Sequence, residues 1–308
     1  MAPRARVGRA LLPIDWGEIS PLRLHARVVA EGLYAGAHRS TRRGAGVEFG
    51  GQRPYVPGDD LRFLDRRSLL KHDRLMIREF ETDTERALWL CLDASASMAF
   101  RGATAPGAKL AYAALLAAAL TRVALTGHDP VGLGWIGPSA LRDVAAGAGE
   151  LSFERVVSAL ETAVAAGSLD GAEPLFERAM RRLARRARRG SVVVLFSDLL
   201  DLPPSAMSAV AALGARSRAL VVVQVLDPVE RDLTFHGKVK LRAIEDERMV
   251  ETDADVVREQ YRARLAAHAE SWARAVQGEG GRLVRCCSTD RATAVVRDVL
   301  RACAEARR

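Results

Sequence analysis

From position 87 onward, short apolar runs alternate with longer segments in which apolar residues recur at helical spacing. The short runs have the length and the branched side chains of buried strands. Such alternation is typical of an α/β fold with a doubly wound, mainly parallel sheet flanked by helices. The predicted strands are 87–92, 131–136, 191–196, 219–226 and 282–286, with a more polar extended piece at 238–243. The predicted helices are 109–126, 153–165, 174–189, 205–214, 253–277 and 291–304.

The N-terminal part of the chain has a different character. It is rich in Gly, Arg and Asp, with one helical stretch at 22–32 followed by turn residues through Gly58. Apolar and polar residues alternate around position 77, which predicts an edge strand. We therefore divide the chain into an N-terminal segment, 1–86, rich in turns and β structure, and an α/β domain, 87–308. We expect the first to pack against the second.

Composition sets the class of protein. The 308 residues are 49% hydrophobic and 27% charged, which is enough for a sizeable core. The longest apolar stretches, 113–120 and 220–226, are much shorter than the roughly 20 residues of a membrane span, and no signal peptide is evident. The four cysteines form no C-x-x-C pair, which favours buried thiols in a reducing compartment. The sequence thus predicts a cytoplasmic protein without a membrane span.

The formal net charge of +8 is concentrated in the arginines of the predicted helix 174–189. These arginines could follow an anionic partner such as nucleic acid. They also lie opposite an apolar set at helical spacing, which is the pattern of a solvated helix face. No aromatic residue lies among them as a stacking platform for bases. We therefore favour the solvated face and keep nucleic-acid binding as an alternative.

Polar oxygens follow two of the predicted strands. Asp93, Ser95 and Ser97 come directly after the first strand, and Asp198 follows the strongest strand of the chain. Functional sites of open α/β sheets lie beyond the carboxyl ends of the strands, so these side chains are expected to converge. Asp and Ser also cap helices, but their place after two strands favours a metal. Hydroxyl and carboxylate oxygens suit Mg²⁺, with Mn²⁺ or Ca²⁺ possible.

The D-x-S-x-S loop with the later Ser-Asp pair resembles the metal-ion-dependent adhesion site of von Willebrand factor A domains. The resemblance implies that the two serines ligate the ion directly and that the aspartates act mainly through water. A threonine from another loop adds a ligand, and an acidic side chain of the protein partner completes the coordination. It therefore implies a metal-dependent protein–protein interaction module.

Further motifs resemble the bacterial family called domain of unknown function 58, over about 22–301. These motifs are Glu48-Phe49, Arg53 to Arg62, Arg74 to Glu81, Asp129 to Leu133, Val225 to Glu230 and Tyr261. Genes of that family commonly neighbour a MoxR-type AAA+ ATPase. The resemblance implies a non-enzymatic adaptor that cooperates with such an ATPase in the assembly or maturation of a protein complex.

The chain departs from the family pattern at the threonine-bearing loop. That loop usually reads Gly-x-Thr-Asp-Leu, and the matching stretch here is Gly171-Ala172-Glu173-Pro174-Leu175. Glu173 is therefore a candidate fifth ligand, which would either bind the metal more tightly or occupy the place of the partner's acidic group. Ser168 is the alternative donor if the loop aligns differently.

The N-terminal P-G-D-D motif has two interpretations. Pro57-Gly58 makes a turn and an aspartate caps the next helix, which is the simpler reading. The neighbouring polar side chains could instead form a docking surface for the partner. The candidate docking residues are Arg53, Tyr55, Asp59, Asp60 and Arg62.

The chain lacks the key residues of several enzyme classes. A phosphotransferase of the haloacid dehalogenase type needs a second aspartate where this chain has Ser95. The chain has no G-x-S-x-G elbow and no G-x-x-x-x-G-K-[ST] phosphate loop. We expect no enzymatic activity, no catalytic residues and no small-molecule substrate, with a metal-dependent hydrolase or phosphatase as the alternative.

Overall fold

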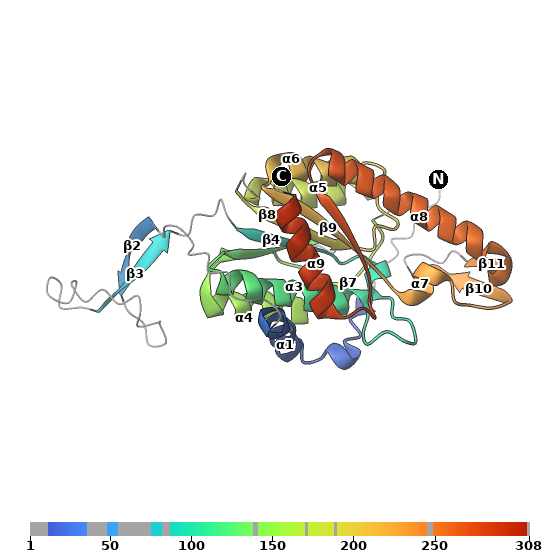
Figure 1. Ribbon diagram of the computed structural model, residues 1–308, viewed down its shortest axis with the longest axis horizontal. Helices are drawn as coiled ribbons and strands as arrows, with labels where there is room; N and C mark the ends of the chain where they lie inside the picture. The colour runs from blue at the N-terminus through green and yellow to red at the C-terminus, as the bar shows by residue number, and fades with distance from the viewer. Residues whose placement is uncertain are drawn as a thin grey trace, which may run out of the picture.

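The computed structural model describes residues 12–35, 48–54, 75–81, 87–137, 141–169, 172–187, 190–244 and 249–306. Its centre is a six-stranded sheet in the order β12-β9-β8-β4-β5-β6 (Figure 1). Neighbouring strands pair in parallel except for β6, which runs antiparallel to β5 at one edge. The strands are β4 Leu88–Asp93, β5 Val131–Ile136, β6 Val144–Gly147, β8 Val192–Ser197, β9 Ala219–Leu226 and β12 Arg282–Cys287.

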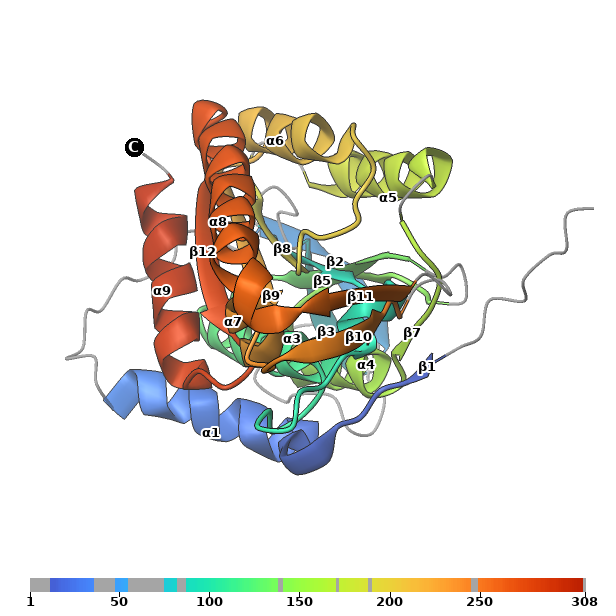
Figure 2. The ribbon, with the colours of Figure 1, turned by 90° about the vertical axis from the view of Figure 1, so that its right-hand side faces the viewer.

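Helices cover both faces of this sheet (Figure 2). One face carries α1 Leu22–Ala35, α3 Lys109–Thr126, α4 Gly149–Glu161 and α9 Ala292–Glu305. The other carries α5 Glu173–Arg186, α6 Ala206–Arg216 and α8 Ala254–Gly278. The expected doubly wound α/β architecture is therefore confirmed.

The central strand β4 explains why two cores form. Leu88, Leu90 and Leu92 belong to the core under α1, α3, α4 and α9. Trp89 and Cys91 belong to the core under α5, α6 and α8. Side chains alternate between the faces of a strand, so a continuous apolar run serves both layers. The strand ends at Asp93, where the first polar side chain appears.

Some elements differ from the sequence-based expectation. The helix expected at 153–165 lies at Gly149–Glu161 and is followed by β7 Val164–Ala165, which pairs with β1 Leu12–Pro13. The short β6 was not expected, because its four residues have no clear alternation. The helix α7 Pro228–Asp232 and the antiparallel pair β10 Lys238–Arg242 and β11 Met249–Asp253 follow β9 at its carboxyl end.

The N-terminal segment contains an antiparallel pair of its own. β2 Glu48–Pro54 pairs with β3 Met76–Glu81, with an irregularity at Phe49/Gly51. The edge strand expected around position 77 is therefore present as β3. Within the described residues its hydrogen-bonded neighbour is β2 and not a strand of the central sheet.

Two helices bear on earlier expectations. In the described part of the chain, α3 is long and apolar enough to cross a membrane by length and composition, although the sequence suggested no such span. Residues 109–121 of this helix are buried in the protein core, which makes its length and apolarity weak evidence for a span. The helix α5 buries its apolar set, while its five described arginines are solvent-exposed.

Candidate metal centre

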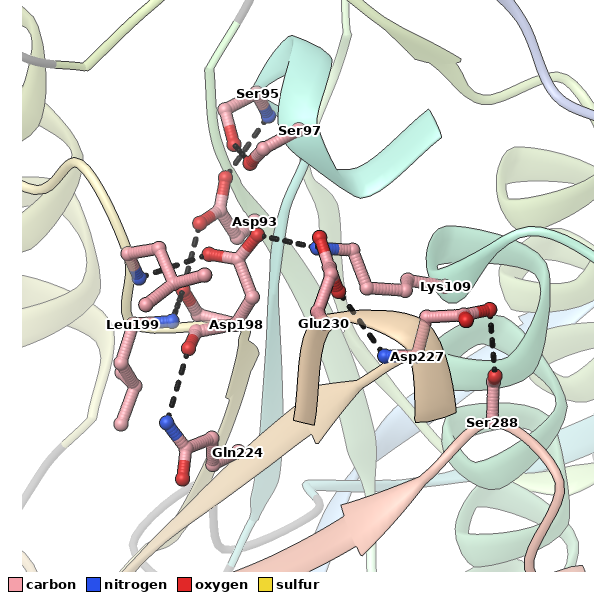
Figure 3. Close-up of polar contacts among 12 residues, drawn as sticks. Asp93, Ser95, Ser97, Lys109, Asp198, Leu199, Gln224, Asp227, Glu230 and Ser288 are labelled. Atoms are coloured by element: carbon pink, nitrogen blue, oxygen red, sulfur yellow. Dashed lines mark hydrogen bonds and ion pairs between the residues drawn. The ribbon is translucent and has the colours of Figure 1, made fainter. Parts of the chain in front are cut away.

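The candidate centre lies where two neighbouring strands end. Strands β4 and β8 pair in parallel with Leu92 opposite Phe196, so Asp93 and Ser197 leave the sheet side by side. Asp198 follows directly after β8, and the D-x-S-x-S loop follows β4 into the short 3-10 helix η4 Ala96–Ala99. The structure therefore brings Asp93, Ser95, Ser97 and Asp198 together (Figure 3).

The Asp93 carboxylate is held at both oxygens. Its Oδ1 accepts a hydrogen bond from the Ser95 backbone N at 2.8 Å, and its Oδ2 accepts one from Ser197 Oγ at 2.7 Å. Ser197 in turn accepts from the Leu199 backbone N at 2.9 Å. The Asp93 side chain is fully buried, so these bonds fix its direction. Sequence reasoning did not assign Ser197 a role, although it directly precedes Asp198.

The two loop serines face each other. Ser95 Oγ and Ser97 Oγ lie 3.1 Å apart, within hydrogen-bond distance. Their residues are 2% and 8% exposed, so this pair of hydroxyls is almost closed off from solvent. Two hydroxyl oxygens at this separation can both coordinate one cation.

Asp198 is clamped from three directions. Its Oδ1 accepts from the Leu200 backbone N at 3.0 Å, and its Oδ2 accepts from Lys109 Nζ at 2.7 Å. Its backbone oxygen accepts from Gln224 Nε2 at 3.2 Å. The carboxylate is fully buried, and Lys109 is the first residue of α3. The Asp198 carboxylate is therefore paired with the buried ammonium of Lys109.

Lys109 is a site residue that sequence reasoning missed. Its ammonium donates to Glu230 Oε1 at 2.6 Å as well as to Asp198. The usable signal in the sequence was a lysine at the start of a helix whose next twelve residues are otherwise uncharged and buried. A buried lysine needs anionic partners, but no local pattern identifies them at positions 198 and 230.

Glu230 is positioned by the start of α7. Asp227 caps that helix by accepting from the Val229 backbone N at 2.9 Å, and Glu230 Oε2 accepts from the Asp227 backbone N at 3.0 Å. This reciprocal arrangement is a capping box. The Gly102 backbone N also donates to Asp227 Oδ2 at 2.8 Å, so the loop that follows η4 is tied to the end of β9.

Charge and burial shift the titration of the site. Burial, followed by the neighbouring Asp198 charge, raises the pKa of Asp93 to about 6, although its hydrogen bonds oppose the shift. Burial alone would lower the pKa of Lys109, but Asp198 and Glu230 outweigh it and raise that pKa. Burial also raises the pKa of Glu230, against the effect of Lys109. The carboxylates of Asp93 and Asp198 therefore lie close enough to repel each other.

The loop after β7, which contains Ser168, contacts the D-x-S-x-S loop through backbone hydrogen bonds. The Ala166 N donates to the Ala94 O at 3.0 Å, and the Ala96 N donates to the Gly167 O at 2.9 Å. This places Ser168 next in the chain after the contact. Glu173 instead begins α5, is half-buried, and makes no hydrogen bond or ion pair to the four clustered residues in the described structure. The contact brings the loop of Ser168 to the D-x-S-x-S loop, and both Glu173 and Ser168 stay predictions as the additional oxygen donor.

The N-terminal docking candidates stay predictions. Tyr55, Asp59, Asp60 and Arg62 lie outside the described residues. Arg53 lies in β2, for which only the backbone is described.

The chemistry of the cluster is that of hard oxygen ligands. In the described ranges no group of three His, Cys, Asp or Glu side chains could hold a metal ion by itself. A cation bound here would therefore depend on the serine hydroxyls as well as on the carboxylates. Such a mixture suits Mg²⁺ or Mn²⁺ better than a thiophilic metal.

Comparison with solved structures finds bacterial proteins of low sequence identity. The protein BatB from Bacteroides thetaiotaomicron is 13% identical, with a TM-score of 0.43, covering 70% of this chain and 98% of that one. An aerotolerance-related membrane protein from Bacteroides fragilis is 15% identical, with a TM-score of 0.43, covering 71% and 98%. An uncharacterized membrane spanning protein from Vibrio fischeri is 14% identical, with a TM-score of 0.22, covering 70% and 98%.

The predicted cytoplasmic location is contradicted by this comparison. Two of these three proteins are named as membrane proteins. The prediction rested on sparse cysteines and on the absence of a long apolar run. Neither feature distinguishes a cytoplasmic protein from one associated with a membrane.

Proteins found by sequence comparison have a higher identity to this chain than these structures do. Uncharacterized proteins from Mycobacterium tuberculosis and Mycobacterium bovis are each 31% identical over 264 residues, which is 85% of this chain and 81% of theirs. The family model described as "Protein of unknown function DUF58" matches residues 51–271. That match spans most of the α/β domain and the second half of the N-terminal segment. The chain therefore belongs to the DUF58 family of proteins of unknown function.

Proposed function

We propose that this protein is a non-enzymatic adaptor that binds a protein partner through a divalent cation at Asp93, Ser95, Ser97 and Asp198. The observation that carries the proposal is the convergence of two hydroxyls and two carboxylates at adjacent strand ends. These are the two serines and two aspartates of the donor set implied by the resemblance to von Willebrand factor A domains, without its threonine. The ion would act as a Lewis acid that attracts an acidic side chain of the partner.

The spacing of the serine hydroxyls is close to that of neighbouring ligands of one cation. Neighbouring ligands of an octahedral ion with Mg–O distances of about 2.0–2.1 Å lie about 2.9 Å apart, whereas Ca²⁺ at about 2.3–2.6 Å separates them by about 3.3–3.7 Å. The Ser95 and Ser97 oxygens are 3.1 Å apart. This separation lies between the two spacings, so the choice of Mg²⁺ or Mn²⁺ rests on the hydroxyl and carboxylate donors.

The aspartates suit a supporting role. Each carboxylate oxygen of Asp93 and Asp198 already accepts a hydrogen bond from a protein donor. Carboxylates fixed in this way can orient ion-bound water and supply negative charge without moving. The serines would then be the direct ligands.

The partner class follows from the family resemblance. We propose a MoxR-type AAA+ ATPase as the partner, with an acidic side chain as the group that meets the ion. With both proteins purified, the ATPase is expected to be retained on the immobilised adaptor in Mg²⁺ buffer and released by a chelator. Equal retention in both buffers would contradict a metal-dependent contact.

Removal of the serine hydroxyls is expected to abolish ion binding. In Ser95→Ala/Ser97→Ala the two direct ligands are lost while the buried carboxylates remain. Titration calorimetry with Mn²⁺ is expected to show heat for the wild-type protein and none for the double variant. Ser208→Ala is a matched control, since this exposed hydroxyl of α6 bonds only locally to the Ser205 O. Full Mn²⁺ binding by the double variant would exclude the serines as ligands.

A further inference from the structure

We infer that Lys109 is the positioning residue of the metal centre, holding the Asp198 carboxylate in its ion-facing orientation before any cation arrives. This inference rests on the proposed function and deepens it. Lys109 is the only lysine or arginine that the described part of the chain buries. An ammonium in a protein interior is expensive unless its ion pairs are well formed, so its presence here calls for a specific role.

The Lys109 ammonium is engaged by two carboxylates. It contacts Asp198 Oδ2 and Glu230 Oε1, at 2.7 and 2.6 Å (Figure 3). It makes no hydrogen bond to Asp93, Ser95 or Ser97. Within the described residues, Lys109 therefore acts on the cluster through Asp198 alone.

The clamp on Asp198 depends on Lys109. The Leu200 backbone N holds Oδ1, and Lys109 holds Oδ2, so together they fix the rotation of the carboxylate. Without the ammonium, no other hydrogen-bond donor in the described part of the chain would hold Oδ2, and the buried carboxylates of Asp93 and Asp198 would lack a compensating charge. Asp198 would then turn away from Asp93 or take up a proton, and either change would impair ion binding.

Glu230 keeps the lysine in place. Its Oε2 is fixed by the capping box of α7, and its backbone oxygen accepts a hydrogen bond from the Tyr261 hydroxyl of α8. Its Oε1 is thereby available to Lys109 in a constant position. Elements far apart in sequence, α3, α7 and α8, thus fix one carboxylate of the metal centre.

The test compares Mn²⁺ affinity with stability in three variants. Lys109→Met keeps the length of the side chain and removes its charge. We expect Mn²⁺ affinity to fall about 10- to 100-fold, as for other groups that orient metal ligands. Glu230→Gln leaves Lys109 on Asp198 and is expected to reduce the affinity far less. Lys240→Met, which removes an exposed lysine paired with Glu251, is the matched control and is expected to bind as the wild type.

The double variant Lys109→Met/Glu230→Gln separates positioning from stability, because it removes both charges of the pair. If Lys109 serves only to neutralise Glu230, the double variant regains both the melting temperature and the Mn²⁺ affinity, which would overturn the inference. If Lys109 positions Asp198, the melting temperature rises above that of Lys109→Met but stays below the wild-type value, because Asp198 still lacks its partner, and the Mn²⁺ affinity stays low. Wild-type affinity in Lys109→Met would overturn the inference and leave the proposed function intact. Absence of Mn²⁺ binding in the wild-type protein would overturn both.

Discussion

Without divalent cations, Asp93→Asn is expected to unfold at a higher temperature than the wild-type protein, and saturating Mg²⁺ is expected to reverse that order. The variant replaces a buried carboxylate next to Asp198 by a neutral amide of the same shape. Relief of burial and repulsion is expected to add roughly 1–3 kcal/mol to the free energy of unfolding at neutral pH. Mg²⁺ then stabilises only the protein that binds it, by mass action.

The stabilising effect of Asp93→Asn is expected to depend on pH. The folded protein raises the pKa of Asp93 from 3.8 to about 6, so the folded state holds this proton more tightly than the unfolded chain. The contribution of Asp93 to stability is therefore present below about pH 4 and is lost as pH rises through about 6. Denaturant unfolding in chelator at pH 4.5 and 7.5 should show a larger advantage of Asp93→Asn at pH 7.5. The exposed Asp298→Asn is the control, and an equal advantage at both values would contradict the assigned repulsion.

Gly102→Ala is expected to destabilise the protein and weaken ion binding although Gly102 is no ligand. A Cβ there would lie 2.2 Å from Asp227 Oδ1 and 2.8 Å from its Cγ. Asp227 is fully buried and caps α7, so it cannot turn aside without releasing Val229 and disturbing Glu230. Overpacking together with loss of a cap suggests a cost of roughly 2–4 kcal/mol in the free energy of unfolding.

Urea unfolding and Mn²⁺ titration of the same samples check this expectation. Gly278→Ala is the matched control, since a Cβ at that position meets no atom within 4 Å. Its unfolding free energy should stay within about 1 kcal/mol of the wild type, as for other helix glycines replaced by alanine. Wild-type stability of Gly102→Ala would show that the loop yields more easily than the contact suggests.

The sequence was sufficient to locate the carboxylates and hydroxyls of the candidate centre. Apolar runs ending at Asp93 and before Asp198 identified two strand ends, and parallel pairing brings such ends to one edge of a sheet. The alternating hydrophobicity of the α/β domain was equally clear, and helix α3 and strands β5 and β9 lie where expected.

The rest of the centre depends on contacts that no local pattern encodes. Lys109, Asp198 and Glu230 meet from three elements, and their separations in sequence have no period that a motif could show. The short strands β1, β6 and β7 depend on tertiary pairing and have too few residues for an alternation to be recognised. The approach of the loop that contains Ser168 to the D-x-S-x-S loop also depends on a backbone contact, between Ala96 and Gly167.

The alternation along β4 ties the ion site to the alignment of the whole sheet. Asp93 continues the series of Trp89 and Cys91, whereas the leucines between them fill the opposite core. A shift of one residue in the pairing of β4 with β8 would exchange the two sets of side chains between the cores. The Trp89 side chain would then enter the core of the leucines, and the Asp93 carboxylate would move away from Ser197. Misaligned chains would therefore fail to bind the ion as well as fail to pack, so metal capture would report correct folding of the central strand.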